Sequence, residues 1–121
     1  MTAVEWAAVA VIGGGASTVR FLVDRSIGAR VRTSLPVGTL TVNFTGALAL
    51  GILSGLTVGS TVSLLAGTAA VGSYTTFSTW MLETQRLSEE RQHRAAVANL
   101  VISVVLGLGA AALGRVIGAN L

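Results

Sequence analysis

The feature that most constrains this chain is a long stretch without charge. No charged side chain occurs in the fifty residues between Arg32 and Glu83. Over the whole chain 52% of residues are hydrophobic and only 11% are charged, whereas soluble domains carry roughly 25% charged residues. Because water solvates such a chain poorly and hydrocarbon demands paired backbone groups, we predict an all-α membrane protein.

Apolar segments long enough to cross a bilayer divide the chain. A spanning helix needs about 20 mostly apolar residues. We predict four transmembrane helices, over residues 4–23, 36–56, 61–84 and 95–118, in a single domain that covers residues 1–121. The second helix contains the pair Gly51 and Gly55, and the fourth contains Gly114 and Gly118. This Gly-x-x-x-Gly spacing predicts close packing between helices.

Hydroxyl side chains gather in the third predicted helix, where residues 72–83 carry six of them. An unsatisfied polar group costs several kcal/mol in hydrocarbon, so these hydroxyls must face protein, water or an ion. Gly72 followed by the capping hydroxyls of Ser73, Thr75 and Thr76 predicts a helix that stops and restarts at mid-membrane, which frees backbone carbonyls for an ion. The alternative is an unbroken helix whose hydroxyls bond its own backbone.

Polar residues in the second and fourth helices follow the helical repeat. Thr39 and Asn43 are four residues apart and share a face, as do Asn99 and Ser103. These side chains either join neighbouring helices by hydrogen bonds or present donors to an anion.

One side of the third helix carries Phe77, Trp80 and Glu83, each three residues apart. The edge of an aromatic ring is the positive side of its quadrupole, so inward rings can face an anion, although core packing is the commoner role. Arg20, near the end of the first helix, either snorkels to the interface or draws anions into a vestibule.

Several functions are disfavoured by the composition. The chain contains no cysteine, its only histidine is His93, and no nucleophile–base pair indicates an enzyme. The net charge of +3 comes from eight arginines near the ends of the predicted spans. That distribution indicates membrane orientation, and we expect no nucleic-acid partner.

Four segments of the chain carry the motifs of one known family. Residues 13–21 (GGGASTVRF) are similar to its GGxxGAxxRY, with the glycines slightly shifted. Residues 38–46 (GTLTVNFTG) match GTLxVNxxG, and residues 72–80 (GSYTTFSTW) with Glu83 are similar to GxxTTFSTF…E. Residues 103–107 fit the SxxxG of its last helix. With these motifs the chain resembles the Fluc/CrcB fluoride channels, over nearly its whole length and in the family's order.

The resemblance implies a four-helix subunit that pairs as an antiparallel dimer, with two fluoride pathways along the dimer interface. It implies a structural sodium ion, and no organic cofactor, held by the backbone carbonyls of Gly72 and Thr75. The anion pathway it implies contains Phe77, Asn43, Ser78, Thr79, Thr39, Trp80, Arg20, Glu83, Asn99 and Ser103.

Three positions depart from the family pattern. Trp80 stands where a phenylalanine is common, Asn99 where a tyrosine is expected, and Gly107 adds no hydroxyl.

We therefore expect a fluoride-selective channel of the bacterial cell membrane that gives passive fluoride export and fluoride resistance. Fluoride is strongly hydrated, so a pore must replace its water with hydroxyl, amide and ring-edge contacts at several weak sites. The main alternative is a proton-coupled transporter of the small multidrug-resistance type, which needs a carboxylate deep in the membrane, whereas Glu5 and Glu83 lie near span ends. A structural membrane protein is a further alternative.

The arginines also bear on the partner. The first and third connections carry six of them, against Arg115 alone on the other side: Arg25, Arg30, Arg32, Arg86, Arg91 and Arg94. The positive-inside rule then places both connections in the cytoplasm. A subunit held in one orientation needs an inverted partner, so the sequence leaves two possibilities, an antiparallel homodimer and a heterodimer with an oppositely oriented paralogue.

Overall fold

The computed structural model describes residues 1–121 and is helical throughout, without strands, which confirms the all-α prediction. Three helices are long and apolar enough to cross a membrane, and together they make a multi-pass architecture. The elements in chain order are α1 (Ala3–Arg30), α2 (Val37–Gly55), α3 (Ser60–Val62), the π-helix η1 (Ser63–Val71), α4 (Gly72–Tyr74), α5 (Ser78–Glu89) and α6 (His93–Ala119).

The first helix is longer than its apolar stretch. A capping box starts α1, in which Thr2 accepts from the Glu5 N–H and Glu5 accepts from the Thr2 N–H. The helix continues to Arg30, beyond the predicted end at residue 23. Arginine is a good helix former, and a cation in the last turn favours the helix dipole. The charged residues after position 23 therefore end the apolar span, but they do not end the helix.

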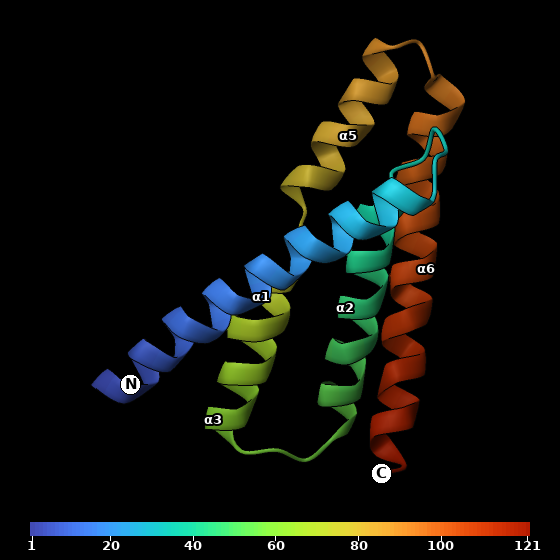
Figure 1. Cartoon of the computed structure of the whole chain (residues 1–121). Helices are drawn as coiled ribbons and strands as arrows, with labels where there is room; N and C mark the ends of the chain where they lie inside the picture. The colour runs from blue at the N-terminus through green and yellow to red at the C-terminus, as the bar shows by residue number, and fades with distance from the viewer.

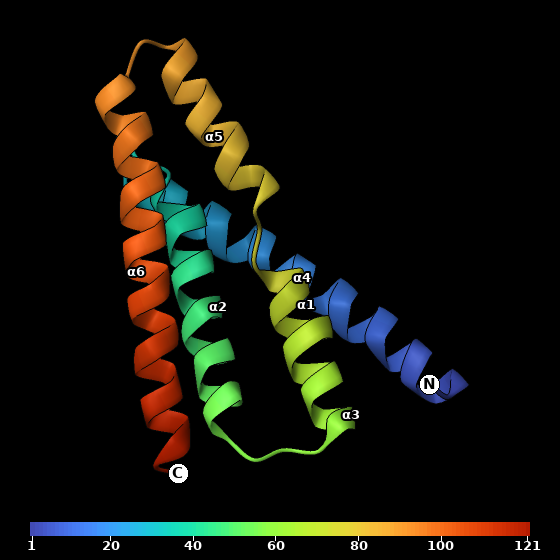
Figure 2. The ribbon, with the colours of Figure 1, turned by 180° about the vertical axis from the view of Figure 1, so that it is seen from behind.

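The two Gly-x-x-x-Gly pairs bring α2 and α6 together. These helices run parallel and side by side in both ribbon views (Figures 1 and 2). A Cβ on Gly51 would overlap the Ala111 carbonyl, and one on Gly114 would overlap the Leu48 carbonyl. The predicted close packing is thus confirmed as a contact within one chain, because only glycine lets the backbones approach this far.

The third predicted span is divided among several elements. From α3 through η1 to α4 the chain forms one helical rod, and α5 then leaves in a different direction (Figure 2). The break was predicted near Gly72, over Gly72–Thr75, but it does not begin at Gly72 itself, which has helical dihedrals (φ −61°, ψ −36°). Helical structure stops instead at Thr75, which is extended (φ −79°, ψ 159°). The lack of a side chain at Gly72 does not break the helix, since its N–H still bonds the Gly67 carbonyl.

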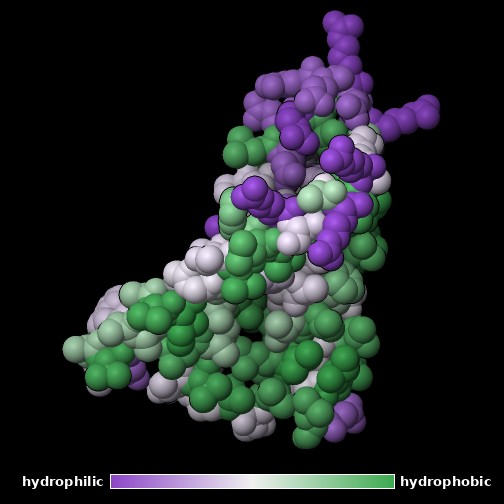
Figure 3. All heavy atoms as spheres, in the orientation of Figure 1, coloured by the Kyte–Doolittle hydropathy of each residue, from purple (hydrophilic) through white to green (hydrophobic).

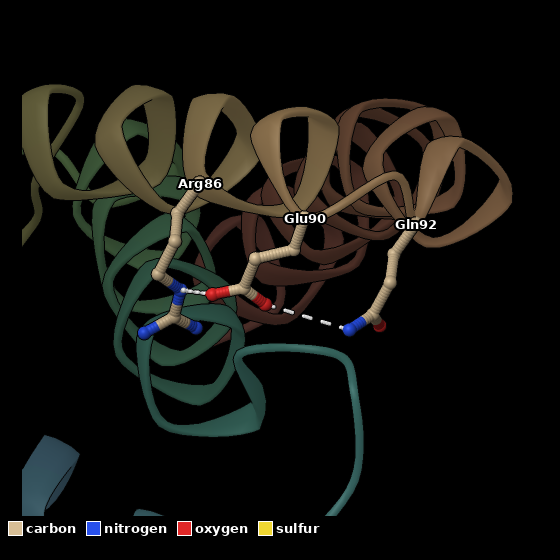
Figure 4. Close-up of polar contacts among 3 residues, drawn as sticks. All are labelled: Arg86, Glu90 and Gln92. Carbon is tan, nitrogen blue, oxygen red and sulfur yellow. Dashed lines mark hydrogen bonds and ion pairs between the residues drawn. The ribbon is translucent and has the colours of Figure 1, made fainter.

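Hydrophilic side chains gather at the end of the molecule that holds the α1–α2 and α5–α6 connections, whereas the faces below are mostly apolar (Figure 3). At the α5–α6 turn Glu90 lies between Arg86 and Gln92, with Arg86 Nε 3.8 Å from its carboxylate (Figure 4). Arg91 adopts a left-handed conformation there (φ 59°) and reverses the chain into α6. The two arginine-bearing connections therefore share one end of the molecule.

Candidate functional site

The side chain of Asn43 pairs with the backbone at the helix interruption. Its Nδ2 donates to the Thr76 carbonyl at 2.9 Å, and its Oδ1 accepts from the Thr76 N–H at 2.8 Å. Thr76 lies outside any helix, so no helical neighbour satisfies these two groups. A primary amide has two donor hydrogens, which leaves one N–H of Asn43 free for another acceptor.

The same interruption releases two backbone carbonyls. The Thr76 N–H, which an unbroken helix would direct to Gly72, bonds Asn43 instead. The Thr79 N–H, which would serve Thr75, bonds the Thr76 hydroxyl at 3.2 Å. Arg20 approaches the Thr75 carbonyl, with its Nη1 at 3.3 Å. The carbonyls of Gly72 and Thr75 thus lack their helical partners, and carbonyl oxygens are suitable ligands for an alkali cation.

A cavity of about 410 Å³ collects several of the predicted pathway residues. Asn43, Trp80 and Ser103 line it, and they come from α2, α5 and α6 respectively. Thr75 adds a polar residue to its wall, and Gly107 adds a position without a side chain. The arrangement places an amide, a hydroxyl and an aromatic ring around one volume, which are the groups that can replace the hydration of a small anion.

The two aromatic rings meet edge to face. The centroids of Phe77 and Trp80 are 5.7 Å apart, and the ring planes are 80° from parallel. Phe77 is 69% exposed in the single chain, although it is a large hydrophobic residue. Its free ring edge is therefore available to a group outside this chain.

A second, smaller cavity of about 190 Å³ has walls from α1, α2 and the residues that follow α4. Arg20, Thr39 and Thr79 line it, together with Asp24 and Thr76. Thr39 is 2% exposed, and its hydroxyl donates to the carboxylate of Glu83, which does not itself line the cavity. Arg20, Thr39 and Thr79 thus form a second group of predicted residues, around a polar cavity whose wall carries both signs of charge, from Arg20 and Asp24.

Four predicted residues line neither cavity, namely Phe77, Ser78, Glu83 and Asn99. Ser78 is exposed at the start of α5. Asn99 is 4% exposed, and its side chain bonds Thr84 instead of lining either cavity.

Two residues that take part in these contacts, Thr84 and Asp24, were not assigned a site role from the sequence, and no local pattern marked them. Thr76 was expected among the hydroxyl residues able to cap the restarting helix, and its hydroxyl accepts from the Thr79 N–H. Its backbone pairing with Asn43 was not foreseen.

Fold and site together define a small multi-pass helical membrane protein whose polar groups converge on a helix interruption. A profile of the family described as CrcB-like protein, Camphor Resistance (CrcB), matches residues 7–115. The chain belongs to the CrcB family, whose relatives below are named fluoride-specific ion channels.

Several relatives resemble the chain over most of its length. The fluoride-specific ion channel FluC 2 of Mycobacterium bovis is 59% identical over 115 residues, which cover 95% of this chain and 91% of the relative. FluC 2 of Mycolicibacterium paratuberculosis is 58% identical over 114 residues, covering 94% and 93%. FluC 1 of Leifsonia xyli is 38% identical over 122 residues, covering 98% and 89%. This family membership favours an ion channel over the multidrug transporter and over an enzyme.

Proposed function

We propose that this chain is the subunit of a fluoride-selective channel that lets fluoride leave the cell passively. The observation that carries the proposal is the cavity at the interruption, where Asn43, Ser103 and Trp80 converge. These groups donate hydrogen bonds or present ring edges without a fixed cation that would retain the ion. The names of the relatives, fluoride-specific ion channels, support fluoride as the ion.

The channel is proposed to be an antiparallel dimer with two pathways along its interface. A single chain leaves Phe77 69% exposed and leaves the cavity open at the surface. A second subunit would supply the missing wall and would bring its own aromatic pair toward the cavity. The exposed apolar side chains of α6, such as Val104 and Leu108, could pack against the second subunit in such an interface.

A structural sodium ion is proposed at the interruption. The carbonyls of Gly72 and Thr75 lack their helical partners, and in a dimer each subunit would contribute both. The ion would supply positive charge to these carbonyls, which otherwise have only the Arg20 guanidinium as a nearby cation. Asn43 holds the Thr76 backbone in place with its side-chain amide, and this keeps the two carbonyls out of a regular helix.

The cellular partner is proposed to be a copy or a paralogue of opposite orientation in the cell membrane. The α1–α2 and α5–α6 connections lie at one end of the molecule (Figure 1), and their arginines favour a single orientation by the positive-inside rule. Relatives are numbered FluC 1 and FluC 2. This numbering supports the view that one organism can have two such proteins, which a heterodimer requires.

The test is fluoride release from proteoliposomes that contain the purified chain, followed with a fluoride electrode. We expect rapid fluoride release and no measurable chloride release under the same gradient. Empty vesicles provide the background. Folded, vesicle-inserted protein that releases fluoride no faster than empty vesicles would refute the proposal for the homodimer, and the same result after co-reconstitution with a paralogue would refute it altogether.

A further inference from the structure

Three hydrogen bonds form a closed circuit between α5 and α6. The indole Nε1 of Trp80 donates to the carbonyl oxygen of Asn99 at 3.2 Å. The side-chain amide of Asn99 donates to the hydroxyl oxygen of Thr84 at 2.9 Å. The Thr84 hydroxyl in turn donates to the carbonyl of Trp80, also at 2.9 Å. Each of the three residues therefore donates one bond and accepts one.

The circuit lies where a broken bond is costly. Asn99 is 4% exposed, and no buried side-chain nitrogen or oxygen of the chain lacks a partner. A polar group left unpaired in such surroundings costs more than the bond contributes when formed. The Thr84 hydroxyl does not contact the indole, but its bond to the Asn99 side chain ties α5 to α6 and so holds Trp80 within reach of the Asn99 backbone carbonyl.

The circuit decides which part of the indole faces the cavity. Tryptophan has a single polar hydrogen, on Nε1. In this chain it is directed to Asn99, while the ring lines the cavity beside Asn43 and Ser103. The cavity therefore meets the carbon-bound edge and face of Trp80, and the strong N–H donor is withheld.

We propose that Asn99 and Thr84 are positioning residues that hold the indole N–H of Trp80 away from the anion path. The inference rests on the proposed fluoride-channel function. Conduction requires sites weak enough to release the ion, and an exposed indole N–H is a stronger anion donor than a ring C–H. If the circuit is broken, the indole rotates, its N–H enters the cavity, and the anion is retained for longer.

The hydrogen bonds between Trp80, Asn99 and Thr84 also link two of the departures from the family pattern. Trp80 replaces the second phenylalanine, and an indole N–H must then find an acceptor when half-buried. The backbone carbonyl of residue 99 supplies that acceptor, and the Asn99 side chain, which is the departure itself, joins α6 to Thr84 on α5. The side chain of Asn99 thus positions the ring from behind, without touching the anion.

The first test is spectroscopic and needs no flux. The chain has two tryptophans, and Trp6 is 62% exposed at the start of α1, so Trp6→Phe leaves Trp80 as the only emitter. In that background we expect Thr84→Val to lower the fluorescence anisotropy of Trp80. We also expect fluoride to quench its emission at least about twofold more strongly, because the N–H reaches the anion. Thr84→Ser, which keeps the hydroxyl, should restore both signals.

The second test separates positioning from simple support of the fold. In the Trp80 protein we expect Thr84→Val to lower fluoride flux about fivefold, the factor that corresponds to one lost hydrogen bond of about 1 kcal/mol. In a Trp80→Phe background no indole N–H exists, so Thr84→Val should change flux less than about twofold relative to Trp80→Phe alone. Thr84→Ser should conduct like the parent.

The outcomes discriminate between the two proposals. If the parent protein releases no fluoride, the proposed channel function fails, whatever Trp80 does. If the parent conducts and Thr84→Val leaves flux and anisotropy unchanged, the positioning inference is wrong. An equal loss of flux in the Trp80 and Trp80→Phe backgrounds, or failure of Thr84→Val to fold in both, shows a purely structural role and likewise overturns it.

Discussion

Replacement of Asn43 by leucine tests the helix interruption most directly. Asn43 makes two hydrogen bonds to the Thr76 backbone, at 2.9 and 2.8 Å, and leucine of similar size makes neither. Hydrogen bonds between membrane helices contribute about 0.6 kcal/mol on average and up to about 1.7. The pair therefore contributes roughly 1 to 3 kcal/mol, which is roughly 5- to 150-fold in the folding equilibrium.

The measurement is the unfolding of purified variants in mixed micelles by increasing sodium dodecyl sulfate, followed by far-ultraviolet circular dichroism. Thr41→Val is the matched control on the same helix, because the Thr41 hydroxyl bonds only the Val37 carbonyl of its own helix. We expect Asn43→Leu to unfold at clearly lower detergent fraction than Thr41→Val. Asn43→Asp keeps one of the two bonds but places a carboxylate beside the cavity, so it should suppress fluoride flux in folded protein.

Equal midpoints for Asn43→Leu and Thr41→Val would refute the assignment of Asn43 to the interruption. Unchanged fluoride flux in folded Asn43→Asp would remove this residue from the anion pathway.

Three further predictions follow from packing, from the carbonyls and from charge. Gly114→Ala should lower the free energy of unfolding by about 1 to 3 kcal/mol through overpacking against α2, whereas Gly109→Ala, which has open space, should be nearly neutral in the same titration. Gly72→Leu should leave helical content unchanged, because a Cβ there meets only the Gly67 carbonyl at 3.7 Å, yet it should abolish flux by obstructing the proposed sodium site; normal flux would contradict that site. Ser88→Cys and Thr57→Cys, both exposed and each the only thiol, should label from opposite sides of intact cells; equal labelling of Ser88→Cys from both sides would show dual topology.

Local sequence signals were enough to predict that this protein is a helical membrane protein with closely packed helices. The uncharged stretch between Arg32 and Glu83 predicted membrane helices, and the Gly-x-x-x-Gly pairs predicted close packing. Both predictions depend on composition and short spacings, which act within one helix or at its surface. The same kind of signal carried the family motifs, including those around Asn43 and Phe77.

The position of the interruption depended on tertiary structure. Sequence reasoning placed the break near Gly72, over Gly72–Thr75, with Gly72 as its start because glycine weakens helices locally. The chain instead leaves the helix at Thr75, and Asn43, 33 residues before Thr76, satisfies the freed peptide. A local propensity of about 1 kcal/mol was outweighed by hydrogen bonds that need a neighbouring helix at the right register.

The sequence by itself determined that the polar side chains of this chain had to be satisfied, and tertiary structure decided by which partners. Asn99 illustrates the difference, because the sequence left open whether it bonds a neighbouring helix or faces an anion, and the structure directs its amide to Thr84 on α5. Hydrophobicity and helical spacing specify which residues share a face of one helix. They do not specify the rotation and register between helices, and hydrogen bonds, which are short and directional, depend on both.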